Sequence, residues 1–308
     1  MKDYHFSVNQ AQRARLETAL NDLQALTPAT VSAAVVSVTD IIPINHEGNI
    51  LRGHWTSDQD GEVVATLCGV VEWVDKLVHL RPLKPRYKAK VHDMIVGRVI
   101  QLAPGCWRLE INSKQHAVLK QQGRRTAVDE LDMRSIFDEN DVVYAEVHGF
   151  QHDGSPELEA RSQKCGKLER GQLLMVPSYL VKHRKQHFHH LVQYGVDLIL
   201  GCNGYIWVGE HVAVSENADM ITDQEKRTEV ENSCPVETRN HICRLANAVR
   251  VLSALGFTLT AELIIETAEA SSSSNIAAND MLGAEFCVQT AEREAKRRAD
   301  LLRQKVVS

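Results

Sequence analysis

The sequence predicts a multidomain, β-rich α+β protein, and three observations lead to this class. Short β-branched runs separated by glycines fill residues 35–80, a string of alternating strands follows over 91–161, and helical patterns dominate the last third of the chain. With 308 residues the chain is long enough for two or three domains. It contains no apolar run of about 18 residues, so we expect no membrane partner.

The N-terminal part is expected to be a helix over residues 11–26 followed by a small all-β unit. Three leucines share the apolar face of the helix at helical spacing: Leu16, Leu20 and Leu23. The strands expected in the β unit are residues 35–38, 62–67 and 68–80. A proline-containing connection leads out of this unit.

Residues 91–161 carry the pattern of a small closed barrel. Its five expected strands are residues 93–102, 106–112, 116–119, 141–150 and 157–161. A charged, helix-prone connection at 126–137 separates the third strand from the fourth. In the second strand Trp107, Leu109 and Ile111 alternate with polar residues, so we expect them to face the core. Five strands with this helical insertion are the layout of an OB barrel, a fold that often binds oligonucleotides.

The C-terminal third is dominated by helical patterns. A helix is expected over 236–255, ended by Gly256, and its apolar stripe holds Ile242, Leu245, Val249 and Leu252. The polar stretch Ser271–Ser274 is interpreted as a flexible linker or a long loop. A final helix is expected over 284–302.

The charge is unevenly distributed along the chain. A net charge of −5 excludes a globally basic nucleic-acid coat, so any RNA contact must come from local patches. Residues 76–90 hold six basic residues and no acid, and residues 181–190 add three basic residues and four histidines. The seven cysteines are scattered without a Cys-x-x-Cys pair, which argues against zinc ribbons and for a reducing compartment.

A Gly-Cys-Asn-Gly string follows the second basic segment and has two interpretations. Its members are Gly201, Cys202, Asn203 and Gly204. A Gly-x-x-Gly loop beside positive charge lets a nucleic-acid backbone approach closely. Because strand-like residues flank the string on both sides, a tight hairpin turn of type I′ at Asn203-Gly204 is the favoured, structural interpretation.

Several ordered blocks of sequence resemble one protein family. These blocks are Leu51–His54, Gly69–Glu72, Val78–Lys84, Val96–Val99, Asp129–Arg134, His187–His189 and Ile199–Trp207. Together they resemble the S1/KH cap subunits of the RNA exosome, the ribosomal RNA-processing protein 4 family, over residues 35–260. The resemblance implies five segments: a helical extension (1–34), an N-terminal β domain (35–87), an S1 barrel (88–163), a KH-like α/β domain (165–260) and a C-terminal helical extension (261–308).

The resemblance also implies a function. Such subunits are one of three caps on a ring of six RNase PH-like subunits, and they help to form the entry channel for single-stranded RNA. The partners it implies are therefore single-stranded RNA, the ring subunits and the other S1/KH caps. Separate nuclease subunits cut the RNA, and the complex works in the nucleus, the nucleolus and the cytoplasm.

No catalytic, cofactor or metal site is expected from the residues themselves. Two groups of acidic residues could serve a two-metal nuclease. The first is Asp129, Glu130 and Asp132, which we interpret as part of a helical connection. The second is Asp138, Glu139 and Asp141, which we interpret as a polar turn. On a helix, His183 and His187 would share a face and could bind a metal. No cysteine or carboxylate lies near them in sequence, and Arg184 and Lys185 would repel a cation.

The residues expected to contact RNA are basic, and a sequence-neutral grip on phosphates fits them better than base readout. The candidates are Lys114, His116, Lys120, Arg124, Arg125, Arg134, Lys182, Arg184 and Lys185. Ordinary solvated surface charge remains an alternative for each of them. For the whole chain two other functions stay open, a pure scaffold without RNA contact and an S1-bearing ribonuclease.

Overall fold

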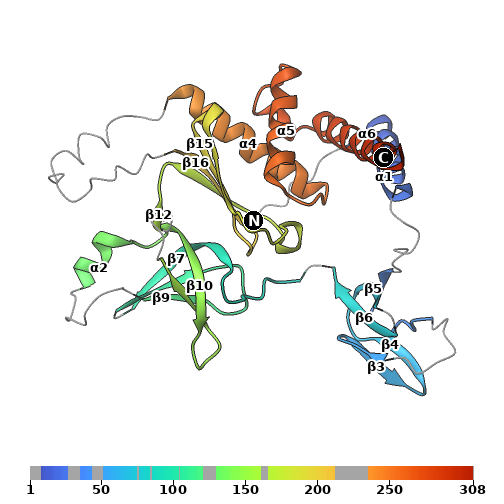
Figure 1. Cartoon of the computed structure of the whole chain (residues 1–308), viewed down its shortest axis with the longest axis horizontal. Helices are drawn as coiled ribbons and strands as arrows, with labels where there is room; N and C mark the ends of the chain where they lie inside the picture. The colour runs from blue at the N-terminus through green and yellow to red at the C-terminus, as the bar shows by residue number, and fades with distance from the viewer. Residues whose placement is uncertain are drawn as a thin grey trace. The chain divides into compact units, whose positions relative to one another are not determined.

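The computed structural model describes residues 8–26, 35–43, 51–74, 76–83, 85–103, 105–120, 130–160, 166–211 and 235–307 (Figure 1). The chain divides into two compact units. The larger spans Arg86–Cys287, and the smaller combines Val8–Pro85 with Val288–Ser308. Several β-sheets and a set of C-terminal helices confirm the expected multidomain, β-rich α+β class.

The N-terminal β domain in the smaller unit contains a four-stranded sheet and a separate hairpin. The sheet has the order β1 (Val35–Val36), β5 (Gly69–Val74), β6 (Leu77–Pro82), β2 (Leu51–Arg52), and the hairpin joins β3 (Thr56–Gln59) to β4 (Glu62–Ala65). The expectation of one strand over 68–80 is wrong, because β5 and β6 are antiparallel partners within this run. The residues between them, Asp75-Lys76, include neither glycine nor proline, so the sequence pattern shows no break.

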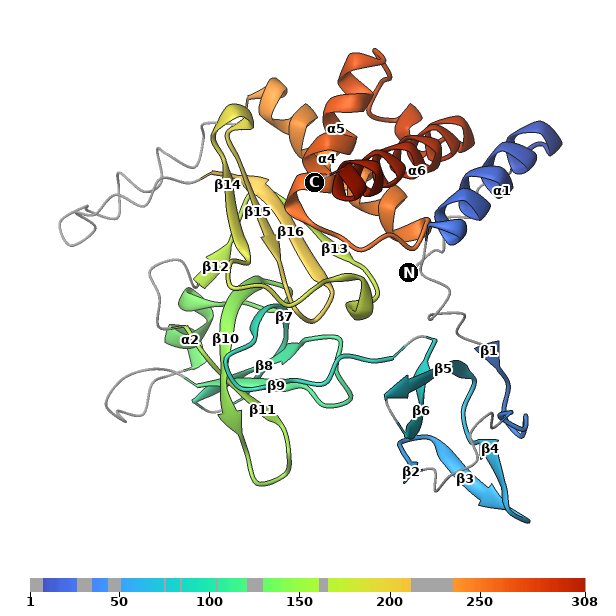
Figure 2. The ribbon, with the colours of Figure 1, turned by 45° about the vertical axis from the view of Figure 1, so that its right-hand side comes forward.

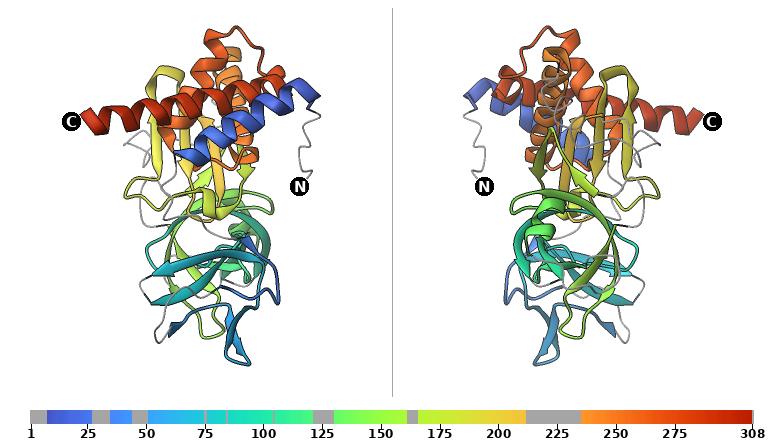
Figure 3. Two further views of the ribbon diagram at one scale, coloured as in Figure 1. Left: turned by 90° about the vertical axis from the view of Figure 1, so that its right-hand side faces the viewer. Right: turned by 90° about the vertical axis from the view of Figure 1, so that its left-hand side faces the viewer.

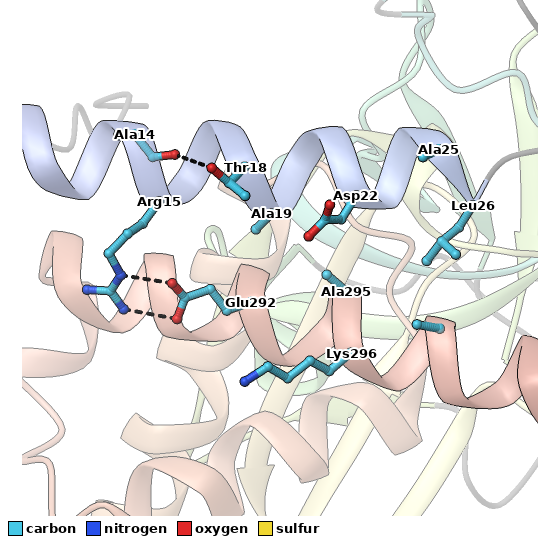
Figure 4. A pocket seen from close by; sticks show the side chains of 11 residues that line it. Ala14, Arg15, Thr18, Ala19, Asp22, Ala25, Leu26, Glu292, Ala295 and Lys296 are labelled. Carbon is cyan, nitrogen blue, oxygen red and sulfur yellow. Dashed lines mark hydrogen bonds and ion pairs between the residues drawn. The ribbon is translucent and has the colours of Figure 1, made fainter.

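Two terminal helices lie side by side, α1 (Gln10–Ala25) and α6 (Ala284–Val307), and the smaller unit contains α6 from Val288 onward (Figure 3). The guanidinium of Arg15 donates to both carboxylate oxygens of Glu292, at 2.8 and 2.9 Å (Figure 4). The expected apolar stripe of α1 is partly wrong, because Leu20 is 41% exposed while Ala19 and Leu23 are buried. Five of the eleven residues that line the groove of about 710 Å³ between the helices are alanines, so small side chains contribute much of this contact.

The S1-type barrel in the larger unit has the five strands that the sequence predicts. They are β7 (Met94–Ala103), β8 (Cys106–Glu110), β9 (Ala117–Lys120), β10 (Val142–Phe150) and β11 (Pro156–Glu159). Strand β11 pairs with both β9 and β10, which closes the barrel, and α2 (Glu130–Ile136) lies between β9 and β10 in sequence. Trp107, Leu109 and Ile111 are buried in the barrel core, as their alternation predicts.

A second antiparallel sheet follows the barrel, with its strands in the order β13-β16-β15-β14. Their bounds are β13 (Gly171–Met175), β14 (Phe188–Leu191), β15 (Val196–Leu200) and β16 (Tyr205–Glu210). Helix α4 (Val236–Ala254) packs against this sheet, and α5 (Ala261–Ser273) packs against α4 (Figure 2). The predicted stripe of α4 is buried, and Gly256 follows the helix with a φ of +75°.

The serine-rich stretch is helical, so the expected linker at Ser271–Ser274 is wrong. Helix α5 continues to Ser273, and the side chain of Ser271 is fully buried. The Oγ of Ser271 donates to the carbonyl of Ala268 at 2.7 Å and accepts from Arg244 at 2.9 Å. The serine-rich composition wrongly predicts a linker, because serine hydroxyls can donate to backbone carbonyls of the preceding helical turn and so remain inside a helix.

The barrel and the second sheet share a buried contact. Val96 of β7 and Tyr144 of β10 pack with three residues of the sheet, Ile199, Tyr205 and Trp207. The short strand β12 (Gly166–Leu168) extends the barrel sheet beside β10, just before the chain enters the second sheet. Among the described residues, no helix has the length and apolar content required to span a membrane.

Candidate RNA-binding surface

The Gly-Cys-Asn-Gly string forms the turn between β15 and β16. The amide of Gly204 donates to the carbonyl of Gly201 at 3.0 Å, and the amide of Gly201 donates to the carbonyl of Tyr205 at 2.9 Å. Within the string only Gly204 has a positive φ, +85°. A type I′ turn at Asn203-Gly204 would require a positive φ at both residues, so the hairpin is confirmed and the turn type is wrong. All four residues of the string are buried.

The same turn is hydrogen-bonded to the barrel. The side-chain amide of Asn203 donates to the carbonyls of Val96 at 2.7 Å and Ile111 at 3.0 Å. In return, the side chain of Asn112 donates to the carbonyl of Asn203 at 2.9 Å. The amide of Cys202 donates to the carbonyl of Met94 at 3.0 Å. The turn is therefore held against the ends of two barrel strands rather than presented to solvent.

A buried carboxylate joins the two basic segments of the chain. Asp93, which is 2% exposed, accepts from the hydroxyl of Tyr87 at 2.6 Å and from the amide of Lys90 at 3.1 Å. Its other oxygen lies 2.5 Å from the Nε2 of His183. Burial, followed by the bond to Asp93, raises the pKa of Tyr87 well above its ordinary value, so Tyr87 remains a donor. These bonds bring residues 86–90 next to residues 182–185.

Besides Arg184, six exposed lysine and arginine side chains lie on these segments and on the neighbouring β8–β9 turn. They are Arg86, Lys88, Lys90, Lys114, Lys182 and Lys185. None of the six forms an ion pair with a residue that the structure describes. Lys114 belongs to the group because it follows Asn112, which bonds the Asn203 turn, and because Ser113 bridges to Tyr87. We call these six residues the junction surface.

The other basic candidates differ from the junction surface. The ammonium of Lys120 lies 2.6 Å from Glu157, and the guanidinium of Arg184 lies 3.1 Å from Glu262. His116 is exposed in the β8–β9 turn, and Arg134 is exposed in the last turn of α2. Arg124 and Arg125 lie outside the described residues.

Three members of the junction surface were not among the residues predicted to contact RNA. The sequence shows that Arg86, Lys88 and Lys90 are part of a basic run, but not that the run lies beside residues 182–185. These three residues alternate with buried Tyr87 and half-buried Ala89. In an extended segment such an alternation predicts that every second side chain faces solvent, so the pattern could have identified them.

Comparison with known proteins places the chain in a family. A family model for the S1 domain of RRP4 matches residues 86–149, and a KH-domain model matches residues 171–214. The chain is 53% identical to the exosome complex component RRP4 homolog of Arabidopsis thaliana, over 97% of this chain and 98% of that protein. The chain belongs to the exosome complex component RRP4 family.

Two fungal members of the RRP4 family agree with this assignment. The rrp4 component of Schizosaccharomyces pombe is 34% identical over 74% of each chain. The RRP4 component of Saccharomyces cerevisiae is 32% identical over 87% of this chain and 80% of that protein. The resemblance noted from the ordered sequence blocks is thereby confirmed at the level of the family.

In this RRP4 family member, the acids considered for metal-dependent cleavage have structural contacts. Asp141 accepts from the amide of Asp138 at 2.8 Å and lies 3.0 Å from the ammonium of Lys167. The amide of Glu139 donates to the side chain of Asp138 at 2.8 Å. Asp129 and the side chains of Glu130 and Asp132 lie outside the described residues.

The fold also creates a cysteine–histidine contact that the sequence does not reveal. The Sγ of Cys202 lies 3.5 Å from the Nε2 of His187. Burial, with nearby Asp93 adding to it, raises the pKa of the Cys202 thiol to about 12. A reactive cysteine typically has the opposite shift, a lowered pKa. His183 and His187 do not lie on a helix, because residues 182–187 form an irregular segment.

Proposed function

We propose that this chain is a non-catalytic cap subunit of the RNA exosome that binds single-stranded RNA through the junction surface. In this proposal it stabilises the ring of RNase PH-like subunits beside the other S1/KH caps and guides RNA into the channel for 3′-to-5′ decay and ribosomal RNA processing. The proposed places of action are the nucleus, the nucleolus and the cytoplasm.

The observation that carries the RNA-binding part is that no side chain of the junction surface has an ion-pair partner among the described residues. Lysine and arginine side chains without a neighbouring acid are free to replace the counterions of phosphates. Six such residues lie around one contact between an OB-type barrel and the KH-like sheet, within the described part of the chain. These side chains would contact the phosphates of the RNA backbone, so we expect the affinity to depend little on base sequence.

The observation that supports assembly lies in the N-terminal β domain, which exposes several large apolar side chains. They are Val35, Ile41, Leu51, Trp55 and Val74, each at least 48% exposed. Exposed apolar side chains gathered on one small domain are typical of a surface that a partner covers. We therefore assign contact with the ring to this domain and contact with RNA to the junction surface.

The test is the affinity of the full chain for fluorescent single-stranded RNA, measured by anisotropy at several salt concentrations. Replacing Lys182 and Lys185 with alanine should lower the affinity about tenfold and reduce the salt slope by about 1.4, because each lost phosphate contact on a single strand contributes about 0.7. The control removes two exposed basic residues elsewhere, Arg13 and Arg303. Equal losses in both double variants would contradict the junction surface as the RNA site.

Two further measurements, co-purification and the length of the RNA after incubation, separate the two alternatives. A pure scaffold would not bind RNA as a purified chain but would still co-purify with ring subunits. An S1-bearing ribonuclease would shorten the RNA in the presence of Mg²⁺ or phosphate, and the junction-surface proposal would then need to include catalysis. Our proposal expects salt-dependent binding and intact RNA.

A further inference from the structure

Three potential metal ligands meet beneath the junction surface. One ligand atom from each of His183, His187 and Cys202 lies within 4.8 Å of the other two. His187 and Cys202 are buried, while His183 is open to solvent on one side. The three residues come from the irregular segment before β14 and from the β15–β16 turn, so only the folded chain brings them together.

The separation of the buried pair matches a metal site. Zinc binds cysteine sulfur at about 2.3 Å and histidine nitrogen at about 2.0–2.1 Å in a tetrahedral arrangement, which places the two ligand atoms roughly 3.6 Å apart. The Sγ of Cys202 and the Nε2 of His187 are 3.5 Å apart. The two ligand atoms therefore need almost no movement to share one ion.

Both histidines also have the outer hydrogen bonds that metal ligands require. The Nδ1 of His187 contacts the carbonyl of Leu200 at 2.8 Å, which fixes the proton there and leaves Nε2 for a metal. The Nε2 of His183 contacts Asp93 at 2.5 Å, which leaves its Nδ1. A carboxylate or carbonyl on the far nitrogen is the usual support of a metal-bound histidine. Asp93 is itself held by Tyr87 and by the amide of Lys90.

We propose that His183, His187 and Cys202 bind one Zn²⁺ ion, with water in the fourth position on the open side of His183. Cysteine sulfur combined with imidazole nitrogen favours zinc over magnesium or calcium. Metal binding displaces the proton of the Cys202 thiol into solvent. The resulting thiolate together with the Asp93 carboxylate offsets the two positive charges of the ion, so the bound state has no net buried charge. Through His183, the bound ion ties the KH-like turn to Asp93 at the start of the barrel.

This inference differs from the expectation of no metal drawn from the sequence. That expectation required a cysteine or carboxylate near the histidines along the chain. Cys202 is 15 residues from His187, and Asp93 is 90 residues from His183. The fold supplies both. Arg184, whose charge argued against a cation, lies 3.1 Å from Glu262 instead.

A second group of residues must be distinguished in any test. His190, Asp197 and His211 also have ligand atoms within 4.8 Å of one another, and both histidines are exposed. Asp197 contacts the Nδ1 of His190 at 2.7 Å and of His211 at 2.9 Å. This group contains no sulfur. A thiolate band therefore distinguishes the proposed site from this second group, and the Cys202→Ser variant assigns the band to Cys202.

The test is a Co²⁺ titration of the untagged full chain, followed by displacement with Zn²⁺. We expect one tightly bound ion with a thiolate-to-cobalt charge-transfer band that Zn²⁺ removes, and a rise in the melting temperature on addition of Zn²⁺. Cys202→Ser should abolish the band and weaken binding at least about 100-fold. Cys287→Ser, which changes another buried thiol, and His211→Ala should both behave like the unaltered chain.

Three outcomes would overturn the proposal. The first is an unaltered chain that binds Co²⁺ without a thiolate band or does not bind it at all, and this measurement requires no variant. The second is a band that persists in Cys202→Ser. Because the side chain of His183 is 56% exposed, His183→Ala should fold normally, and unchanged metal affinity in it would also contradict the site.

Discussion

The side-chain amide of Asn203 donates to the backbone carbonyl of Val96 at 2.7 Å, across the contact between the KH-like sheet and the barrel. The same nitrogen reaches the carbonyl of Ile111 at 3.0 Å, and Asn203 is fully buried. One side chain therefore satisfies carbonyls at the ends of two barrel strands. This makes the Gly-Cys-Asn-Gly turn a connector between domains.

Replacing Asn203 tests this connection. Asn203→Ala leaves two buried carbonyls without a donor, and we expect the free energy of unfolding to fall by about 2–3 kcal/mol. Asn203→Asp should cost more, because it places a carboxylate against the same carbonyls. Urea unfolding measures both. The control is Asn240→Ala, because Asn240 lies on the exposed side of α4. An equal fall in the free energy of unfolding for Asn240→Ala and Asn203→Ala would contradict a specific contribution from the Asn203 hydrogen bonds.

Gly204 should not tolerate a side chain. Its φ is +85°, and a Cβ at this position would lie 2.3 Å from the carbonyl oxygen of Val176. Gly105 is a matched control, because it has a φ of +74° and open space around the position of a Cβ. We expect Gly105→Ala to cost about 1 kcal/mol from backbone strain and Gly204→Ala clearly more. Equal melting temperatures for the two variants would contradict the steric account.

The ion-paired basic residues should matter less for RNA than the basic residues that have no ion-pair partner in the described part of the chain. Lys120 and Arg184 each have an acidic partner, and binding a phosphate would mean giving up that contact. We expect Lys120→Ala with Arg184→Ala to weaken binding of single-stranded RNA less than Lys182→Ala with Lys185→Ala. Anisotropy at one fixed salt concentration compares them. The reverse order would move the RNA site away from the junction surface.

The half-buried position of His189 should make the folded chain less stable in mild acid. Burial is the largest cause that lowers the pKa of His189 below its ordinary 6.5, although nearby Glu262 opposes the shift. Because the folded chain then holds the proton more weakly than the unfolded chain, protonation favours unfolding, and stability falls as the pH drops below about 6.5. Urea unfolding between about pH 7 and pH 5 should show a smaller pH dependence for His189→Gln than for the unaltered chain. An identical dependence in both would refute this role.

Local periodicity was sufficient for much of the fold. The alternation of Trp107, Leu109 and Ile111 places all three in the barrel core, because a strand turns every second side chain the same way. It failed in α1, where Ala19 rather than Leu20 is buried. A search for a hydrophobic stripe selects large apolar residues such as leucine, whereas the contact of this helix is formed largely by small residues such as Ala19.

The candidate site could be predicted only in part, because it depends on contacts between distant residues. The sequence indicates that Lys182 and Lys185 belong to a basic segment and that Asn203-Gly204 turns the chain. It cannot indicate that Asp93 holds His183 beside Lys90 or that Cys202 lies against His187. These contacts form only when the turn packs on the barrel.

The most direct test of the central claim is a map of where RNA touches the chain. Full-length protein is bound to single-stranded RNA containing 4-thiouridine, irradiated, digested and analysed by mass spectrometry. We expect crosslinked peptides from residues 86–90, 113–116 and 181–185, which hold the junction surface. Crosslinks concentrated in the buried turn at 201–204, or on α2 and the far end of β9, would contradict the account.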